Sequence, residues 1–171
     1  MKLIYTIVLL LAGFTLKAQI GTWRTFNKTH YSIQYPSGWT VDSSRQFGAD
    51  LFIAAPVDTI GDKFKENVNV MVQNIAGENV DMERYVSVSE EQIKTMMTDC
   101  EIIESNTITT APTTYHKIIF TGRQGAFALK IEQYYFITKD KAFVVTFTAE
   151  QKRFDDYQVT GEKILQSFRL K

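Results

Sequence analysis

The chain contains few of the side chains on which most catalytic and metal sites depend. Its 171 residues include one cysteine, Cys100, and two histidines, His30 and His116. One cysteine cannot form an internal disulfide, and a zinc site needs three or four nitrogen or sulfur ligands at recognisable spacing. The sequence also has no Gly-x-Ser-x-Gly elbow, no phosphate-binding glycine loop and no His-Glu-x-x-His motif. We therefore expect no catalytic site, no metal site and no cofactor.

Two alternatives to that expectation are open. Cys100 and His116 form the one Cys–His combination that could supply a nucleophile and its base. Asp58, Asp62 and Glu66 could gather oxygen ligands for calcium, although their spacing does not match an EF-hand. We favour a small buried Cys100, a His116 that faces solvent or makes one ordinary hydrogen bond, and a solvated acidic loop.

Charge of either sign is not in excess, because the chain has 19 basic and 19 acidic residues. Binding to nucleic acid needs a basic patch, and binding to a membrane surface needs a basic amphipathic helix. The sequence shows neither feature. We therefore expect no nucleic-acid partner and no role at a membrane surface.

A hydrophobic run long enough to span a membrane is also missing. The apolar stretch Leu3–Phe14 is too short for a comfortable span, and it follows the positive Lys2. This pattern predicts a bacterial secretory signal peptide, residues 1–18, cleaved after Ala18, with an uncleaved N-terminal anchor as the alternative. Cleavage would leave a single domain, residues 19–171, with 17 basic and 19 acidic residues, in the periplasm or outside the cell.

Alternation of apolar and polar residues predicts strands in runs that are joined by tight turns. The strongest signal is the stretch Ala126–Ala149, in which two β-rich runs flank a charged turn at residues 139–141. This pattern predicts an antiparallel hairpin. Further strands are expected at 23–27, 31–35, from 39 onward, 49–55, 67–75, 101–109 and 113–121.

Apolar residues three or four apart predict helices over Met82–Thr98 and Phe154–Phe168. Asp81 is placed to cap the first helix, and a second capping motif would interrupt this helix near Ser87–Ser89. Gly161 lies in the apolar stripe of the second helix, where we expect a close approach to the sheet. The order of elements indicates an α+β fold, an antiparallel β-sheet flanked by helices as an α/β/α sandwich.

The hairpin also suggests a binding surface. Tyr134 and Phe136 lie on the face opposite the main apolar set, and an uncovered apolar patch usually marks a partner or ligand site. The alternative is that helices cover both faces. Phe64, in the polar loop Asp58–Lys65, is a second candidate contact, with a packing role as its alternative. The main apolar set consists of Phe127, Leu129, Ile131, Tyr135, Ile137, Phe143, Val145, Phe147 and Ala149.

Several runs together resemble the PsbP-like family and the related DcrB-like secreted proteins of bacteria: Tyr31–Trp39 (YSIQYPSGW), 67–72 (NVNVMV) and 164–168 (ILQSF), with the predicted helix and hairpin between them. The resemblance covers nearly all of residues 19–171 and implies an antiparallel sheet flanked by helices. It implies little about activity. Plant members are extrinsic subunits of photosystem II and a related fold binds the Ran GTPase, but no functional residue of the family is carried over to this chain.

These observations predict a secreted or periplasmic, non-catalytic PsbP-like domain that acts as a protein-interaction module of the cell envelope. The expected partner is another envelope or secreted protein. The alternative is a protein that binds a small ligand in a cleft between sheet and helix. An enzyme is the third possibility, because no catalytic constellation is visible in the sequence.

Overall fold

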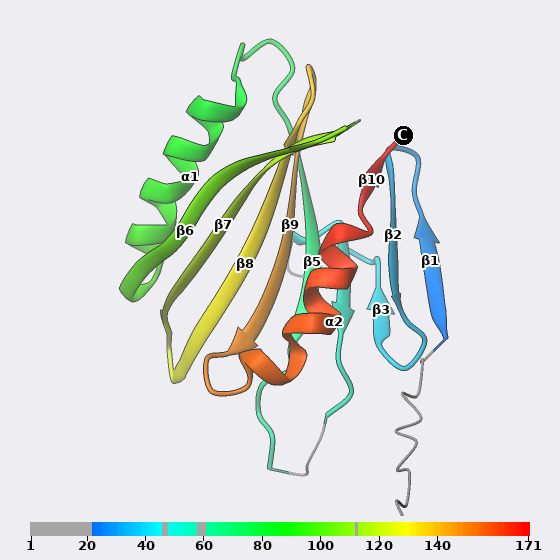
Figure 1. The fold of residues 1–171 in the computed structure, drawn as a ribbon, viewed down its shortest axis with the longest axis vertical. Helices are drawn as coiled ribbons and strands as arrows, with labels where there is room; N and C mark the ends of the chain where they lie inside the picture. Colours follow the sequence, from blue (N-terminus) through cyan, green and yellow to red (C-terminus); the bar gives the residue numbers. More distant parts are fainter. Residues whose placement is uncertain (1–21, 46–47, 58–60, 112) are drawn as a thin grey trace, which may run out of the picture.

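A computed structural model describes residues 22–45, 48–57, 61–111 and 113–171. The expected signal peptide, residues 1–18, lies outside them, as does Asp58 of the possible calcium loop. The described chain forms two antiparallel sheets and two α-helices, α1 (Met82–Met96) and α2 (Phe154–Gln166) (Figure 1).

The larger sheet has seven strands, and the hairpin that dominates the sequence supplies two of its central members. The spatial order is β3 (Thr40–Asp42), β4 (Leu51–Ala54), β5 (Asn67–Asn74), β9 (Lys141–Glu150), β8 (Phe127–Ile137), β7 (Thr113–Gln124) and β6 (Thr98–Thr110). The smaller sheet has the order β1 (Trp23–Asn27), β2 (Tyr31–Pro36) and β10 (Arg169–Leu170). Strand β10 was not expected from the sequence.

The register of the β8–β9 hairpin corrects one sequence-based expectation. Tyr134 pairs with Val145 and Phe136 pairs with Phe143, so even-numbered residues of β8 share a face with odd-numbered residues of β9. The connection Thr138–Lys141 sets this register, and its ends are joined by a 2.8 Å backbone hydrogen bond. The apolar set of β9 therefore faces the same side as Tyr134 and Phe136, and both faces of the hairpin need a cover.

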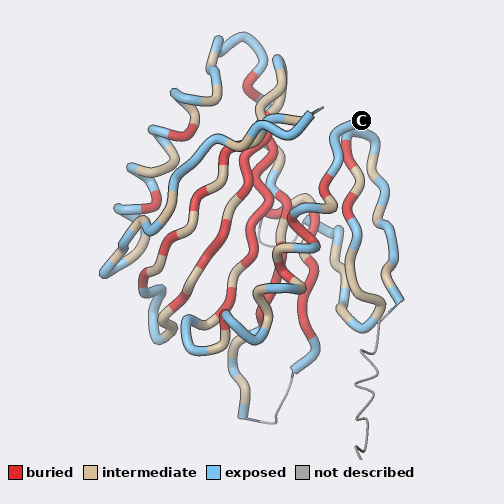
Figure 2. The backbone as a smooth tube through the Cα atoms, in the orientation of Figure 1, coloured by how far each residue is buried: buried red, intermediate tan, exposed pale blue. Residues whose placement is uncertain are grey.

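Two buried clusters meet this need on opposite faces of the larger sheet. On one face, Phe143 and Phe147 of β9 pack with Ile164 of α2 and with Ile33 of β2. On the other face, Val86 and Ile93 are the buried residues of α1, and they pack against the sheet side chains Ile118, Phe120, Leu129 and Ile131. Figure 2 shows these buried positions running along the central strands. Removal of this apolar surface from water is the main stabilising term of the fold.

The layers differ in part from an α/β/α sandwich. Helix α1 covers one face of the larger sheet, but the other face is covered by α2 together with β2 of the smaller sheet. The ring of Phe168, just after α2, stacks on that of Tyr31 in β2 with 5.2 Å between centroids. The antiparallel sheet and the two helices of the expected α+β fold are confirmed, whereas the α/β/α sandwich is matched only in part, because the smaller sheet covers part of one face.

Helix α1 begins where the sequence predicts. The Asp81 side chain accepts a 2.9 Å hydrogen bond from the backbone N–H of Arg84, which satisfies one of the free donors at the helix start. The helix continues through Ser87–Ser89, so the expected interruption there is wrong. The hydroxyl of Ser89 instead donates to the carbonyl oxygen of Tyr85 one turn earlier, which is compatible with an unbroken helix.

Helix α2 lies close to the sheet at Gly161, as expected. A Cβ atom at this position would lie 2.6 Å from the Phe147 ring, which is closer than real Cβ contacts allow. The glycine therefore lets the helix axis approach β9. This contact fixes the height of α2 above the sheet.

Candidate functional site

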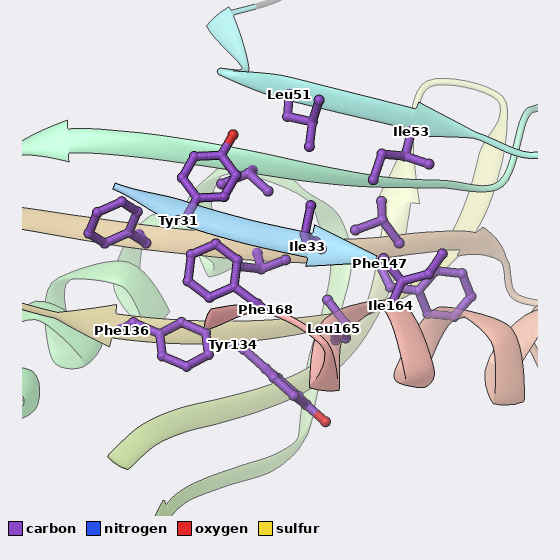
Figure 3. Close-up of a cluster of buried hydrophobic side chains, with 14 of the residues drawn as sticks. Tyr31, Ile33, Leu51, Ile53, Tyr134, Phe136, Phe147, Ile164, Leu165 and Phe168 are labelled. Carbon is purple, nitrogen blue, oxygen red and sulfur yellow. The ribbon is translucent and has the colours of Figure 1, made fainter. Parts of the chain in front are cut away.

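Tyr134 and Phe136, predicted as a possible partner surface, lie in the core of this structure. Each is 3% exposed. The Tyr134 ring stacks on Tyr115 at 4.5 Å between centroids. The Phe136 ring packs on Phe168 at 4.8 Å between centroids, and Figure 3 shows Tyr134, Phe136 and Phe168 within the buried cluster. The possible exposed patch at these two residues is therefore not present, because α2 and Phe168, just after it, cover this face of β8.

Phe64, the third predicted surface residue, is half-buried. Its ring lies 5.2 Å from that of Phe127 at the start of β8, within the cluster on the α1 side. It packs as a plug between the loop and the sheet, and a contact with a partner stays a prediction for this residue.

The structure does not show Cys100 in contact with His116. Cys100 is half-buried at the start of β6, and burial raises the pKa of its thiol, which opposes formation of a nucleophilic thiolate. His116 is buried in β7, where Ser105 Oγ lies 2.9 Å from its Nε2 and Thr107 Oγ1 lies 2.9 Å from its Nδ1.

The Ser105–His116 contact resembles a nucleophile–base pair, but its hydrogen bonds run in the wrong direction for that role. Ser105 donates its single proton to Glu90 Oε1 at 2.5 Å, since a carboxylate can only accept. His116 Nε2 must then donate to Ser105, and Nδ1 accepts from Thr107. Burial lowers the pKa of His116, which is consistent with this neutral form. The network ties α1 to β6 and β7, and in this arrangement His116 does not act as a base toward Ser105.

Strand β6 forms a long outer edge of the larger sheet. Within the described chain no strand pairs with its outer side, and its burial pattern contains no buried residue. From Glu104 to Thr110 it pairs with β7 in continuous register, from Glu104–Ile119 to Thr110–Thr113. We call the segment Glu104–Thr110 the open edge.

Other edges in the described structure are shorter or irregular. The opposite edge of the larger sheet is the three-residue β3, and the smaller sheet ends in the five-residue β1 and the two-residue β10. The first part of β6 has two register shifts, and Asp99 there has a φ of 53°. Short strands and bulges protect edges from pairing with other chains. The open edge is neither short nor bulged, and it contains no lysine and no proline.

A second candidate site is a cleft of about 770 Å³ between the two sheets, which we call the inter-sheet cleft. It lies where the β1–β2 turn and the start of β4 meet the end of β5 and the start of β9. Its apolar part is formed by Tyr31, Val72 and Phe143. The rest of the lining is mostly polar and includes four charged side chains: Lys28, Arg45, Asp50 and Lys141.

Asp50 organises the charges of the inter-sheet cleft. Its carboxylate lies 2.8 Å from Lys28 Nζ and 3.4 Å from Arg45 Nε, and it accepts a 2.8 Å hydrogen bond from the Tyr31 hydroxyl. Burial alone would raise the pKa of Asp50, but the bonds from Lys28 and Tyr31 hold it below its usual range. Burial and the Asp50 hydrogen bond raise the pKa of Tyr31 well above its usual range. These groups thus stay as one carboxylate and one neutral phenol.

Sequence reasoning did not identify the open edge or the inter-sheet cleft. The Thr-rich pattern of residues 101–109 indicated a strand but not that it would be the outermost one. The cleft residues come from four separate strand ends and turns, and no local motif joins them. Among the described residues no group of three or more His, Cys, Asp or Glu side chains could hold a metal ion, and no helix is long and apolar enough to cross a membrane.

Comparisons with known proteins identify the type of fold. A family model described as PsbP matches residues 22–170. The structure is similar to the solution structure of cyanobacterial PsbP (CyanoP) from Synechocystis sp. PCC 6803, with a TM-score of 0.67 and 15% identity, covering 94% of this chain and 99% of that chain.

Two further solved structures share the fold. LpqN, described as involved in cell envelope biogenesis of Mycobacterium tuberculosis, has a TM-score of 0.65 and 9% identity, covering 87% of this chain and 90% of that chain. PA94, a Pseudomonas aeruginosa protein of unknown function, has a TM-score of 0.57 and 9% identity, covering 86% and 96%. A search of curated proteins found no match. At these identities the structures show a common fold and leave the activity open.

Proposed function

Since the chain belongs to the PsbP family, we propose that it is an exported, non-catalytic binding module that recognises another protein of the cell envelope. The signal-like segment 1–18 supports export to the periplasm or beyond, with residues 19–171 as a single mature domain. The description of LpqN, a protein of the same fold, as involved in cell envelope biogenesis supports the same compartment.

The observation that carries the protein-binding role is the open edge of β6. Its seven residues keep a regular register with β7, and five of them are exposed, Ser105, Asn106, Thr107, Thr109 and Thr110. An edge strand presents alternate N–H and C=O groups that another strand can bind, and an extended peptide that adds to such an edge gains main-chain hydrogen bonds. An extended segment of a partner protein is the occupant that fits this geometry.

The hydrogen-bond network behind the open edge supports this role. His116 holds the side chains of Ser105 and Thr107, and Ser105 is also bonded to Glu90 of α1. These bonds order the edge before a partner arrives. A preordered edge loses less conformational entropy on binding than a flexible one.

The charge of β6 indicates the chemistry of the partner segment. The strand carries Asp99, Glu101 and Glu104 and no basic residue. Lys117 neutralises Glu104 at 3.1 Å, whereas no described basic side chain lies within 4.0 Å of the carboxylates of Glu101 or Glu90. Complementary charge favours a partner segment that carries lysine or arginine.

The non-catalytic part of the proposal is supported by the same network. The hydroxyls of Ser105 and Thr107 both lie 2.9 Å from a ring nitrogen of His116, but the Ser105 proton points to Glu90 and the Ser105 oxygen accepts from His116. A nucleophile needs a base that can take its proton. His116 is therefore not a base for Ser105 in this arrangement, and its contacts with Ser105 and Thr107 order the edge.

The test is a crosslinking pull-down from native envelope and medium, with the protein exported under its own N-terminal segment. We expect Thr109→Lys to abolish capture of a reproducible partner, because a lysine on an edge strand opposes strand addition by a basic segment. The matched control is Thr25→Lys, which places the same charge on the exposed strand β1. Equal capture by both variants and the wild type would refute the open edge as the binding surface.

A second candidate function is binding of a small ligand, and the inter-sheet cleft favours it. The cleft volume of about 770 Å³ is in the range of small-molecule sites. The sequence-based alternative placed such a cleft between sheet and helix, whereas this one lies between the two sheets.

A further inference from the structure

We propose that the inter-sheet cleft binds a small organic anion, a carboxylate or phosphate group carried on a short apolar body. The inference rests on the second candidate function, ligand binding in this cleft, and adds the chemical class of the ligand. It is independent of protein binding at the open edge.

The lining of the cleft carries more positive than negative charge. Lys28, Arg45 and Lys141 contribute three positive charges, and Asp50 is the one acidic residue among the described lining. The excess is two positive charges with His30 taken as neutral. Such a charge excess in a concave site attracts an anion from solution.

Internal ion pairs do not remove this excess. Lys28 and Arg45 share the single carboxylate of Asp50, at 2.8 and 3.4 Å. Within the described chain, no carboxylate lies within 4.0 Å of Lys141 Nζ. Lys141 is thus the cleft cation whose charge is available to a ligand, and Arg45, which is mostly exposed, is the second.

The Asp50 carboxylate is a poor site for a cationic ligand. It already accepts from the Tyr31 hydroxyl and faces both Lys28 and Arg45. An incoming cation would have to displace one of these groups and would also meet Lys141. The charge arrangement therefore selects against cations as well as for anions.

The apolar part of the cleft fits the body of the ligand. The rings of Tyr31 and Phe143 meet edge to face at 6.2 Å, and both residues are buried. Because these two rings are only 1% and 2% exposed, the half-buried Val72, beside Phe143 in the neighbouring strand β5, is the apolar side chain that a ligand can reach. An aliphatic chain packed there would lose contact with water, which adds to the affinity of the charged head. The asparagines Asn27 and Asn74 add donors at the rim.

The test uses two probes, inorganic phosphate and hexanoate, with hexanol as the uncharged comparison. Binding to the exported protein is followed by amide chemical shifts in two-dimensional NMR. We expect both anions to shift resonances of Lys28, Val72 and Lys141, with hexanoate binding more tightly than phosphate. Lys141→Ala should weaken anion binding about tenfold, as expected for the loss of one charge-assisted hydrogen bond.

Lys139→Ala is the matched control, because Lys139 lies in the same β8–β9 turn, is exposed and does not line the cleft. It should leave anion binding unchanged. Equal weakening by both variants would show diffuse electrostatic attraction and would overturn the proposal. Binding of hexanol without binding of either anion would also overturn it, while leaving the second candidate function intact. Binding of none of the three probes would contradict both.

Discussion

Two buried carboxyl groups, Glu132 and Glu66, stand out at the scale of single residues. Glu132 lies in β8 on the α2 side and is fully buried. Lys117 Nζ lies 4.0 Å from its carboxylate, and within the described chain neither carboxylate oxygen has a hydrogen-bond partner of good geometry. Burial raises the pKa of Glu132, with a smaller rise from Glu162. Burial also raises the pKa of Glu66. Both groups therefore favour the neutral form in the folded protein.

Stability should fall as pH rises because of these residues. A carboxyl whose pKa is higher in the folded than in the unfolded chain stabilises the fold fully below its ordinary value, near 4.5. This stabilisation is lost as pH rises through the folded-state pKa, at about 1.4 kcal/mol for each unit of difference. Glu132→Gln should flatten this decline in urea unfolding measured between pH 4 and 8. Glu91→Gln, at an exposed position, should leave the decline unchanged. If Glu132→Gln also left the decline unchanged, Lys117 would fully compensate the charge of Glu132.

Gly161 allows a second prediction about a single residue. Alanine normally stabilises a helix by up to about 1 kcal/mol over glycine. Here the added Cβ would clash with the Phe147 ring at 2.6 Å, so we expect Gly161→Ala to destabilise the protein by about 1–3 kcal/mol. Thermal and urea unfolding would measure it. Gly38→Ala is the control, since nothing lies within 4 Å of its Cβ position and little change is expected there. Stabilisation by Gly161→Ala would mean that α2 moves freely on the sheet.

At the scale of elements, local patterns predicted most helices and strands and failed on their register. The helix predicted over Met82–Thr98 is α1, and the strand predicted over 113–121 is the core of β7. The prediction that Tyr134 faces away from the apolar set of β9 was wrong, because a turn that is one residue longer or shorter reverses the face of a whole strand. The alternation within β8 carries no information on that turn. Strand β10 has two residues and pairs with β2, far away in sequence, so no local signal could reveal it.

The start of α1 is an element whose stability depends on one residue. Asp81 satisfies the backbone N–H of Arg84, and loss of an N-cap costs about 1 kcal/mol. We expect Asp81→Ala to lower the free energy of unfolding by roughly this amount and to speed hydrogen exchange in the first turn of α1. Asp81→Ser should retain most of the stability, because serine is also a good N-cap. Equal losses in both variants would assign the effect to charge and not to capping.

At the scale of the whole molecule, one aromatic residue joins three parts of the fold. The Phe168 ring lies 5.2 Å from Tyr31 in the smaller sheet, and 4.8 and 5.9 Å from Phe136 and Phe143 in the larger sheet. It follows α2 directly. The two sheets and the helix thus share one core on this side, and we expect them to unfold together.

Phe168→Ala tests this cooperation. Loss of a fully buried ring costs about 3–5 kcal/mol, so the variant should show a large fall in stability with a single urea transition. Fluorescence and circular dichroism should give coincident curves. Phe64→Ala, which removes a half-buried ring with one aromatic neighbour, should cost less. Two separate transitions would show that the smaller sheet is an independent unit.

The sequence was sufficient for the fold family and insufficient for the candidate sites. Structural residues such as Tyr31, Trp39 and Phe168 carry the family pattern, and they lie in local motifs that a single sequence displays. The open edge and the inter-sheet cleft depend on which strand is outermost and on which turns meet in space. Lys28 contacts Asp50, 22 residues away, and Lys141, from the second half of the chain, lines the same cleft. Such contacts follow from the topology of the sheets.

The most direct test of the protein-binding role is hydrogen exchange of the backbone amides, compared between the free protein and the protein bound to the partner retained in the pull-down. Strand addition protects alternate amides of the edge that accepts the new strand. We predict slower exchange at alternate positions within Glu104–Thr110, with β1 unchanged. Partner binding that leaves exchange in β6 unaltered would contradict the open edge as the binding surface, and protection elsewhere would identify the true surface.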